Sequence, residues 1–410
     1  MGFKTIPLSQ RSWRSALFSG KAKERKEVKK RYPLAIIFYK NDRRGRHAYD
    51  TLAYLVNNLL RRDFMKKVFR MISLLAFGFF TVAIVPFPVT AAEFIMKISL
   101  PSPMVEWTQF NEPYAVLKSE IEKRSNGRIE VQLYPAGVLG DMISGVEQVK
   151  KGIIQGVQVG DGWIANHFPE IQVISIPYIF KDRDVAWKVL DGPFGKEIME
   201  SYVKKTGLQL LQLTENGGFR CFSNNVKEIK TAADMKGLKI RVMPNPAHQE
   251  TVKALGALPV TVDWGELYTA LQTKVADGQE NAIPTFLVPK LYEVQKYMTL
   301  DGHFYSINSI IIQEKWYKSL PKELQHAIDQ AAFISTTVNR GVCTALEQKG
   351  IKLIQEKGMK VYAPTEKEKE TFKVASQKPV VEFLKTKIDQ AWIDKIFKAV
   401  DRAEKELGYK

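Results

Sequence analysis

The chain has 410 residues, 45% of them hydrophobic, which is enough for two globular domains. Its formal net charge of +17 would favour a nucleic-acid or anionic-membrane partner. Residues 1–64, however, hold 16 Lys and Arg against 5 Asp and Glu, and residues 65–92 add three more basic side chains. Residues 93–410 therefore carry a net charge of only +3, so the charge gives no case for nucleic acid.

Residues 65–92 have the three-part pattern of a cleavable secretory signal peptide. They begin with MKKVFR, continue with the uncharged run MISLLAFGFFTVAIV and end in PFPVTAAE, which predicts cleavage after Ala91 or Ala92 and a periplasmic location. The apolar run is about 15 residues long, short of the roughly 20 that span a bilayer, and a retained anchor is the alternative. Because this signal starts at Met65, we interpret residues 1–64 as a mis-assigned start, with a basic cytoplasmic arm as the alternative.

From residue 93 onward, predicted strands alternate with predicted helices. The expected strands lie near 94–101, 128–135, 154–160, 208–214, 238–243 and 258–262, with a strand or buried extended segment at 172–180. The expected helices lie near 112–127, 144–153, 184–207 (with a break at Gly192-Pro193), 247–256 and 264–274, and the last hundred residues are mainly helical. This alternation predicts an α/β fold with parallel sheets covered by helices.

No catalytic or metal-binding pattern is found in the sequence. The five histidines are scattered, and there is no HExxH, CxxC, G-x-S-x-G or phosphate-loop motif. Asp277 and Glu280 could act as paired carboxylates, although the Asp-Gly step more often marks a turn. Cys221 and Cys343 do not make a disulfide framework and could equally be buried thiols. We therefore expect no enzyme activity, no metal and no cofactor.

Two arginines lie in apolar surroundings. Arg241 is in GLKIRVM, where Leu238, Ile240 and Val242 alternate with charged residues as in a half-buried strand that ends at Pro244. Arg220 follows two glycines in ENGGFRCFSNN. A buried guanidinium needs an anionic or carbonyl partner, and its planar fork matches a carboxylate. The residues alone leave three readings open: a solvent-facing charge, a structural salt bridge, or an anion site.

Several segments together resemble the solute-binding proteins of TRAP (tripartite ATP-independent periplasmic) transporters, the DctP-like family. They are YPAGVLGD, VEQVKKG, IPYIF, GGFRCFSN, GLKIRVM and ALGALPVTVDWGELYTALQTKVADGQEN, in the family's order from about residue 95 to 400. The resemblance implies that Arg241 forms a salt bridge with the substrate carboxylate and that Arg220 is a second anion contact. It further implies that Asn281 hydrogen-bonds the ligand, that Trp264 packs over its carbon skeleton, and that contacts near Asp161 help to set the substrate. Ala282 departs from the proline that usually follows DGQEN.

The resemblance also implies a two-lobed periplasmic-binding-protein fold with a hinge and a long helix bridging both lobes. The first lobe would comprise residues 93–217 with 307–346, and the second 218–306 with 347–410. The implied function is capture of a small organic acid and its delivery to a TRAP permease driven by an ion gradient, by a protein that is a monomer, with a dimer as the alternative. A secreted enzyme or membrane-anchored sensor on the same scaffold is the competing hypothesis, because a fold does not determine a function.

Overall fold

The structure is a computed structural model that describes residues 91–409. The predicted basic extension 1–64 and the predicted signal peptide up to residue 90 lie outside the described residues. None of the helices between residues 91 and 409 is both long and apolar enough to cross a membrane.

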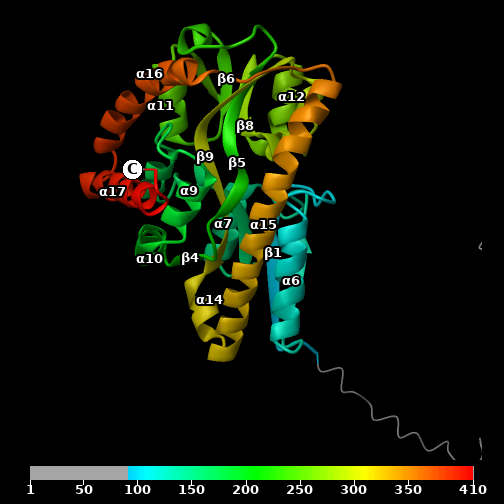
Figure 1. Cartoon of the computed structure of the whole chain (residues 1–410). Helices are drawn as coiled ribbons and strands as arrows, with labels where there is room; N and C mark the ends of the chain where they lie inside the picture. Colours follow the sequence, from blue (N-terminus) through cyan, green and yellow to red (C-terminus); the bar gives the residue numbers. More distant parts are fainter. Residues whose placement is uncertain (1–90, 410) are drawn as a thin grey trace, which may run out of the picture. The chain divides into compact units, whose positions relative to one another are not determined.

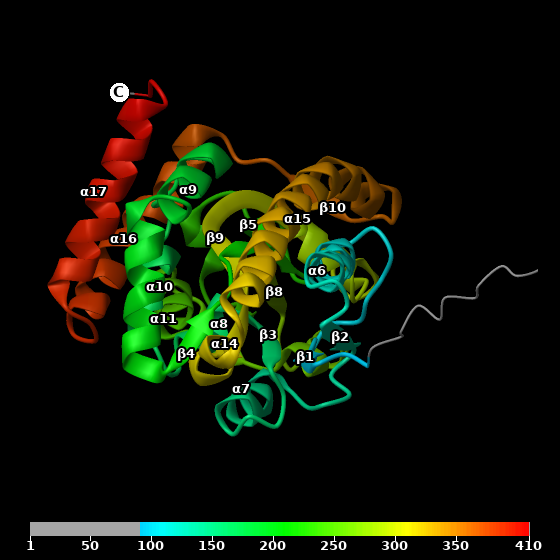
Figure 2. The same cartoon turned by 90° about the horizontal axis from the view of Figure 1, so that it is seen from below.

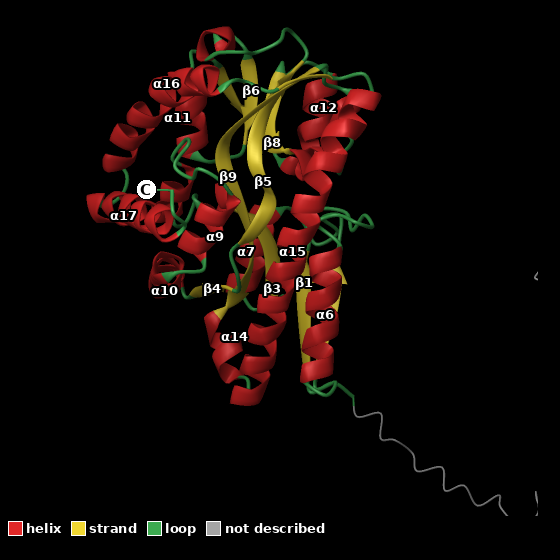
Figure 3. Ribbon diagram, in the orientation of Figure 1, coloured by secondary structure: helices red, strands yellow, loops and turns green. Residues whose placement is uncertain are grey.

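The described strands form a ten-stranded sheet in the order β2-β1-β3-β9-β5-β8-β6-β7, in which β4 and β10 also pair with β9. The strands are β1 (Phe94–Ser99), β2 (Ile129–Tyr134), β3 (Gly156–Gly160), β4 (Leu208–Leu210), β5 (Thr214–Asn224), β6 (Lys239–Val242), β7 (Leu258–Thr261), β8 (Gly278–Ala282), β9 (Tyr297–Gln313) and β10 (Lys360–Tyr362). Strands β5 and β9 run side by side along the middle of the molecule (Figure 3).

The sheet is mixed, so the expectation of purely parallel sheets is wrong. Strands β1, β2 and β3 are parallel to one another, as are β6, β7 and β8. Strand β9, however, is antiparallel to β3, β4 and β5, and β5 is antiparallel to β8. No strand was expected at Tyr297–Gln313, which forms β9. Asp301-Gly302 does not end this strand but lies where its pairing with β5 is irregular.

The predicted helices are present, with two groups on different sides of the sheet (Figure 2). The α-helices are α6 (Glu112–Arg124), α7 (Met142–Lys150), α8 (Asp161–Ile164), α9 (Arg183–Leu190), α10 (Pro193–Thr206), α11 (Pro246–Ala254), α12 (Leu267–Gln272), α13 (Ile283–Leu287), α14 (Glu314–Ser319), α15 (Lys322–Glu356), α16 (Glu366–Lys385) and α17 (Gln390–Glu406). Short 3-10 helices are η1 (Pro169–Ser175), η2 (Ala232–Met235), η3 (Trp264–Glu266) and η4 (Leu291–Glu293). The expected break at Gly192-Pro193 separates α9 from α10, since proline is well suited to the first turn of a helix.

The long helix α15 runs beside α6 in the lower half of Figure 1 and reaches the region of α12 in the upper half. Its apolar face packs with α6 and strands β1 and β2 in one buried cluster, which includes Leu117, Ile121, Leu324 and Ile328. Helices α9, α10 and α17 cover a separate cluster. These two cores hold the sheet from different sides and fix the strands that carry the polar residues described below.

The predicted lobe boundaries remain a prediction, and they fall inside three continuous elements. The boundary at 217/218 lies in a bulge of β5, where the register with β9 shifts between Glu215 and Gly218. Gly217 and Gly218 have φ angles of 88° and 97° there, a region that L side chains rarely adopt. A Cβ on Gly218 would also clash with Nη2 of Arg183. The chain therefore changes direction at glycines that no larger residue can replace without strain.

Two further expectations are settled by the fold. The segment 172–180 is not a strand: most of its first half belongs to η1, and its buried Ile and Val side chains serve the core, because an apolar run does not distinguish a strand from another buried segment. Cys221 and Cys343 are both buried and free, in β5 and α15 respectively. Burial raises the pKa of both thiols.

Candidate ligand-binding site

A small, partly open pocket, called the cavity below, is lined by side chains from both predicted lobes. Its volume is about 10 Å³, on the order of what one water molecule needs. The lining residues are Ser102, Phe110, Met142, Gln158, Trp163, Asn216, Arg241, Met243, Trp264, Asn281, Thr285 and Asn308. Because this volume is so small, an acid of several carbon atoms can enter only if the walls move apart.

Arg241 brings a positive charge to this cavity from strand β6. The strand lies between β7 and β8, and Arg241 is fully buried, so the expected half-buried strand is instead covered on both faces. Its Nε and Nη2 both donate to the carbonyl oxygen of Val262, at 2.9 and 2.7 Å, and Nη1 takes part in neither bond. Within residues 91–409 no carboxylate forms an ion pair with Arg241.

Burial affects the charge of Arg241 directly. Loss of hydration lowers the pKa of its guanidinium to about 10, against an opposing effect of Glu280 and a reinforcing effect of Arg220. The side chain remains protonated at neutral pH, so the cavity holds a desolvated cation. Such a charge is stabilised by an anion that can accept hydrogen bonds from its free edge.

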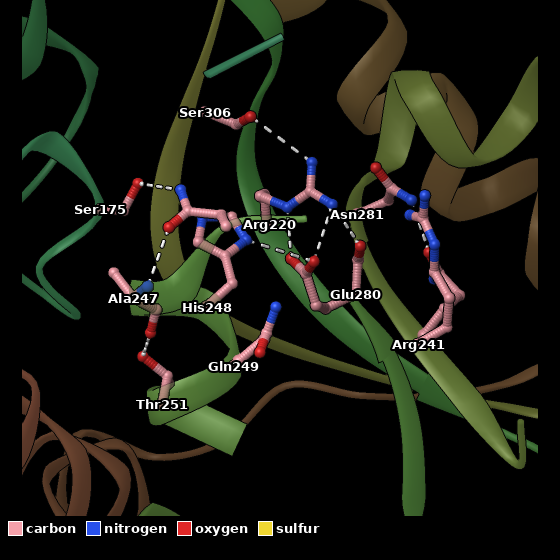
Figure 4. Close-up of polar contacts among 12 residues, drawn as sticks. Ser175, Arg220, Arg241, Ala247, His248, Gln249, Thr251, Glu280, Asn281 and Ser306 are labelled. Carbon is pink, nitrogen blue, oxygen red and sulfur yellow. Dashed lines mark hydrogen bonds and ion pairs between the residues drawn. The ribbon is translucent and has the colours of Figure 1, made fainter. Parts of the chain in front are cut away.

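Arg220 is equally buried but has a carboxylate partner inside the protein (Figure 4). It donates from Nε to Oε2 of Glu280, from Nη2 to Oε1 at 2.9 Å, and from Nη1 to Ser306 at 3.4 Å. Arg220 pairs with Ala282 across strands β5 and β8, so Glu280, two residues away, shares its face while Asn281 faces the other way. Burial disfavours the Glu280 carboxylate, but the charge of Arg220 outweighs this and holds its pKa well below the usual range.

Two buried histidines extend this ion pair. His303 places Nδ1 2.7 Å from Asp301 and Nε2 3.4 Å from Glu280. His248 lies 3.6 Å from Glu280 and 3.7 Å from Asp161. Burial opposes the charged form of His303, yet Asp301 and Glu280 outweigh it and raise the pKa of the imidazole. Glu280 therefore has Arg220 and two imidazoles as close neighbours, while both ring nitrogens of His248 lack a hydrogen-bond partner within residues 91–409.

Comparison with known proteins identifies the family. The model of the DctP family, bacterial extracellular solute-binding protein family 7, matches residues 107–387. The chain belongs to the DctP family. A solute-binding protein of Verminephrobacter eiseniae is 36% identical over 242 residues, which cover 59% of this chain and 72% of the relative.

Solved DctP-family structures share the fold over their whole length. A TRAP periplasmic solute-binding protein of Polaromonas, crystallised with D-erythronate, is 31% identical and has a TM-score of 0.69 over 75% of this chain and 98% of its own. The sugar acid binding protein of Advenella mimigardefordensis, in complex with galactonate, is also 31% identical, with a TM-score of 0.72 over 76% of this chain and 99% of its own. The two-lobed α/β fold expected from the resemblance is confirmed.

Three of the five residues predicted from the DctP resemblance line the cavity: Arg241, Asn281 and Trp264. Figure 4 shows Asn281 beside Arg241. Asn281 donates from Nδ2 to Oε1 of Gln279 at 2.6 Å, and the ring of Trp264 lies 6.2 Å from that of Phe110. A cation, an amide and an aromatic surface therefore meet around one small space.

Arg220 and Asp161 do not line the cavity in this member of the DctP family. Arg220 is held by Glu280, and the Asp161 carboxylate accepts hydrogen bonds from Ser306 at 2.8 Å and Ser175 at 3.4 Å. The structural salt bridge considered for Arg220 is thus present. We therefore leave both residues out of the ligand contacts proposed below.

The cavity is also lined by neutral polar residues that sequence reasoning missed: Ser102, Gln158, Asn216, Thr285 and Asn308. Gln158 lies on β3, Asn308 on β9 and Asn216 on β5, which meet only through antiparallel pairing. The position of Asn216 beside Arg220 in ENGGFR was an available signal. The others gave none, because a single amide in a strand has no distinctive pattern.

A larger and open groove of about 740 Å³ lies elsewhere, between α9, β9, α15 and α16. It contains none of the five predicted residues, and Arg183 on its wall is already bonded to Glu215 and Glu347. Within residues 91–409 no cluster of three or more His, Cys, Asp or Glu side chains is arranged to hold a metal ion.

Proposed function

We propose that the chain is a periplasmic solute-binding protein that captures a small organic acid through a salt bridge between Arg241 and the ligand carboxylate, and delivers it to a TRAP permease. The observation that supports this proposal most strongly is which groups form hydrogen bonds with Arg241. Its guanidinium is fully buried and lines the cavity, but within the described chain it is bonded only to a backbone carbonyl. A carboxylate approaching the free edge would supply the missing negative charge.

The solved relatives support the class of ligand. The Polaromonas protein holds D-erythronate and the Advenella protein holds galactonate, and both are carboxylates. Closure around such an acid is a population shift, because the ligand favours the state in which both walls contact it. The small cavity volume is what a closed state would have. Since family members are binding proteins, we propose binding and delivery instead of catalysis.

Mass spectrometry of the solute released from the purified protein tests this proposal directly. We expect an organic acid, and we expect the same acid to raise the midpoint of thermal unfolding of ligand-free protein. A ligand at 100 times its dissociation constant stabilises the folded state by about 2.7 kcal/mol. A set of organic acids that leaves the midpoint unchanged, together with release of a neutral or cationic solute, would contradict the proposal.

Export is part of the same proposal and has its own test. The mature chain is expected to begin near Ala92 or Glu93, and to be a monomer, with a dimer as the alternative. N-terminal sequencing and light scattering of protein recovered from the periplasm measure both. A mature chain that starts at Met1 and retains residues 65–92 would favour the membrane-anchored alternative.

Delivery to a permease is tested by transport. With the cognate membrane subunits in proteoliposomes, uptake of the identified acid should require this protein and an ion gradient. Uptake that proceeds equally without the protein would contradict the delivery step while leaving ligand binding intact.

A further inference from the structure

The charge of the cavity lining is the first constraint on the ligand. Among the described residues that line it, Arg241 is the one with a charged side chain, and the other polar groups are amides, hydroxyls and the indole N–H groups of Trp163 and Trp264. A ligand with one carboxylate would balance this lining. A second carboxylate would have no cation to meet, and a buried charge without a partner costs several kcal/mol.

The direction of the hydrogen bonds around the cavity is the second constraint. The Asp161 carboxylate can only accept, so Ser306 donates to it, at 2.8 Å. Ser306 has no further hydrogen to give, so Asn216 must donate its Nδ2 to Ser306, at 3.3 Å. Asn308 then donates to Asn216 at 3.2 Å, and Gln158 donates to Asn308 at 2.8 Å. The chain of bonds thus ends at a carbonyl, Oε1 of Gln158, which has no partner within residues 91–409.

A second chain of hydrogen bonds has the same direction. The backbone carbonyl of Val294 can only accept, and Gln295 donates its Nε2 to it at 2.9 Å. Ser223 donates to Gln295 at 2.9 Å, and Gln279 donates to Ser223 at 2.8 Å. Asn281 donates to Gln279, which leaves its own carbonyl Oδ1 outside the chain, on a residue that lines the cavity.

A third, shorter chain starts at Thr285, which lines the cavity. Thr285 donates to the backbone carbonyl of Asn216 at 2.8 Å and accepts from Nε2 of Gln109 at 3.1 Å. Oε1 of Gln109 is again a buried carbonyl without a partner in the described chain, but Gln109 does not line the cavity. On the cavity lining, the carbonyl of Gln158 thus has no donor within residues 91–409, and the carbonyl of Asn281 accepts none of the bonds described above.

We propose that this cavity selects a polyhydroxy monocarboxylate over a dicarboxylate, with Gln158 as the residue that most directly sets this preference. The carboxylate would meet Arg241, and the ligand hydroxyls would donate to the carbonyl ends of Gln158 and Asn281. This inference rests on the proposed function, since it assumes that Arg241 holds one carboxylate. A second carboxylate in place of the hydroxyls would lie beside these carbonyl oxygens with no second cation in the lining to balance its charge.

Competition between acids of equal length tests the preference. Calorimetric titration of wild-type protein with polyhydroxy monocarboxylates of four to six carbons, and with dicarboxylates of the same lengths, measures it. We expect the best hydroxy acid to bind at least about 100-fold more tightly than any dicarboxylate, because a site built for a hydroxyl strongly rejects an analogue that lacks it. A dicarboxylate within tenfold of the best hydroxy acid, or no binding of any hydroxy acid, overturns the inference.

The role of Gln158 is tested with a matched pair of variants. Gln158→Met keeps the length of the side chain but removes the carbonyl, and should weaken hydroxy-acid binding by roughly 10- to 100-fold without weakening dicarboxylate binding. Gln212→Met is the control, because Gln212 also has a buried, unpartnered Oε1 but does not line the cavity. If the two variants weaken hydroxy-acid binding equally, or if Gln158→Met does not weaken it, then Gln158 does not determine the preference for hydroxy acids. The wild-type comparison stands even if a variant fails to fold.

Arg241→Ala separates this inference from the proposed function. If the best ligand of the wild type is a dicarboxylate and Arg241→Ala no longer binds it, the proposed preference for hydroxy acids is wrong. The proposed salt bridge between Arg241 and a ligand carboxylate is then still supported. If the variant binds every acid as the wild type does, the carboxylate capture itself fails.

Discussion

Arg220 and Arg241 are equally buried and lie on strands β5 and β6, which flank β8, but they differ in what surrounds them. All three nitrogens of the Arg220 guanidinium are bonded to Glu280 or Ser306. Arg241 uses two nitrogens on one backbone carbonyl and has no carboxylate partner in the described chain. Burial alone therefore does not distinguish the two arginines, and the proposed ligand contact of Arg241 rests on the identity and number of its internal partners.

The two regions should respond differently to the same substitution. Removal of Arg220 leaves the Glu280 carboxylate buried without its counter-ion, so the folded state should suffer. Removal of Arg241 takes a desolvated cation out of the cavity, so ligand binding should suffer. The predictions below, from the largest expected effect to the smallest, measure that contrast.

Arg220→Ala should destabilise the protein by about 3–5 kcal/mol, the usual result of breaking a buried ion pair from one side. Urea unfolding measures the loss. The double variant Arg220→Met, Glu280→Gln removes both charges at similar volume and should recover most of it. If Arg220→Ala keeps the wild-type stability but loses the ligand, Arg220 is a ligand contact, as the family resemblance implied.

Arg241→Ala should weaken binding of the identified acid by about 2–5 kcal/mol, or roughly 30- to several-thousand-fold. Arg241→Lys keeps the charge but loses the planar fork, so an intermediate loss is expected. Calorimetry gives the ranking, and Lys239→Ala, which removes a half-buried cation from the same strand, is the control. A dissociation constant for Arg241→Ala within threefold of wild type would refute the contrast.

The free energy of unfolding should depend on pH through the titration of His303. Its pKa is raised in the folded state by Asp301 and Glu280 against the effect of burial, so its contribution is complete below the unfolded pKa of about 6.5 and is lost as the pH rises through the folded value. Above pH 6.5 the free energy of unfolding should fall, by at most about 1.4 kcal/mol per pH unit. Urea unfolding of His303→Gln should lack this slope, while an unchanged slope would exclude His303 as its source.

Trp264→Ala should have the smallest effect on binding. It removes an aromatic contact beside Phe110 but leaves the charge pair with Arg241 intact, so we expect a loss of about 0.5–1.5 kcal/mol, or up to roughly tenfold. Titration of the variant beside Arg241→Ala measures both on one scale. A larger loss for Trp264→Ala than for Arg241→Ala would mean that the carbon skeleton, and not the carboxylate, provides most of the affinity.

The sequence predicted this contrast only in part. The family resemblance, and not the local setting alone, predicts that Arg241 contacts the ligand, and the cavity is lined by it together with Asn281 and Trp264. The partner of Arg220 could not be predicted from the sequence, because Glu280 is 60 residues away and contacts Arg220 only through the pairing of β5 with β8. The structural alternative for Arg220 was stated, but local sequence gave no means of choosing it.

The same limit explains the missed amides and the missed strand. Gln158, Asn216 and Asn308 converge because β9 is antiparallel to both β3 and β5, and hydrophobic periodicity contains no information on strand order. Strand β9 was not predicted because it contains Asp301-Gly302, a dipeptide that is typical of turns. In the structure this dipeptide lies where the register between β5 and β9 shifts. Helices with clear periodicity, such as α6 and α11, were placed correctly because their signal is local.

Strand β9 also bears on how this chain acquires its structure. Without it, the sheet separates into one group of β2, β1 and β3 and another of β5, β8, β6 and β7. Each group would then present an unpaired edge, at β3 and at β5, of the kind that recruits other chains. Gly156 of β3 pairs with Ile312 of β9, which is far away in the sequence. Contacts of this kind close very long loops, and this slows folding. We therefore expect the docking of residues 297–313 to limit the folding rate, and the interval before it to be when this protein is most exposed to aggregation.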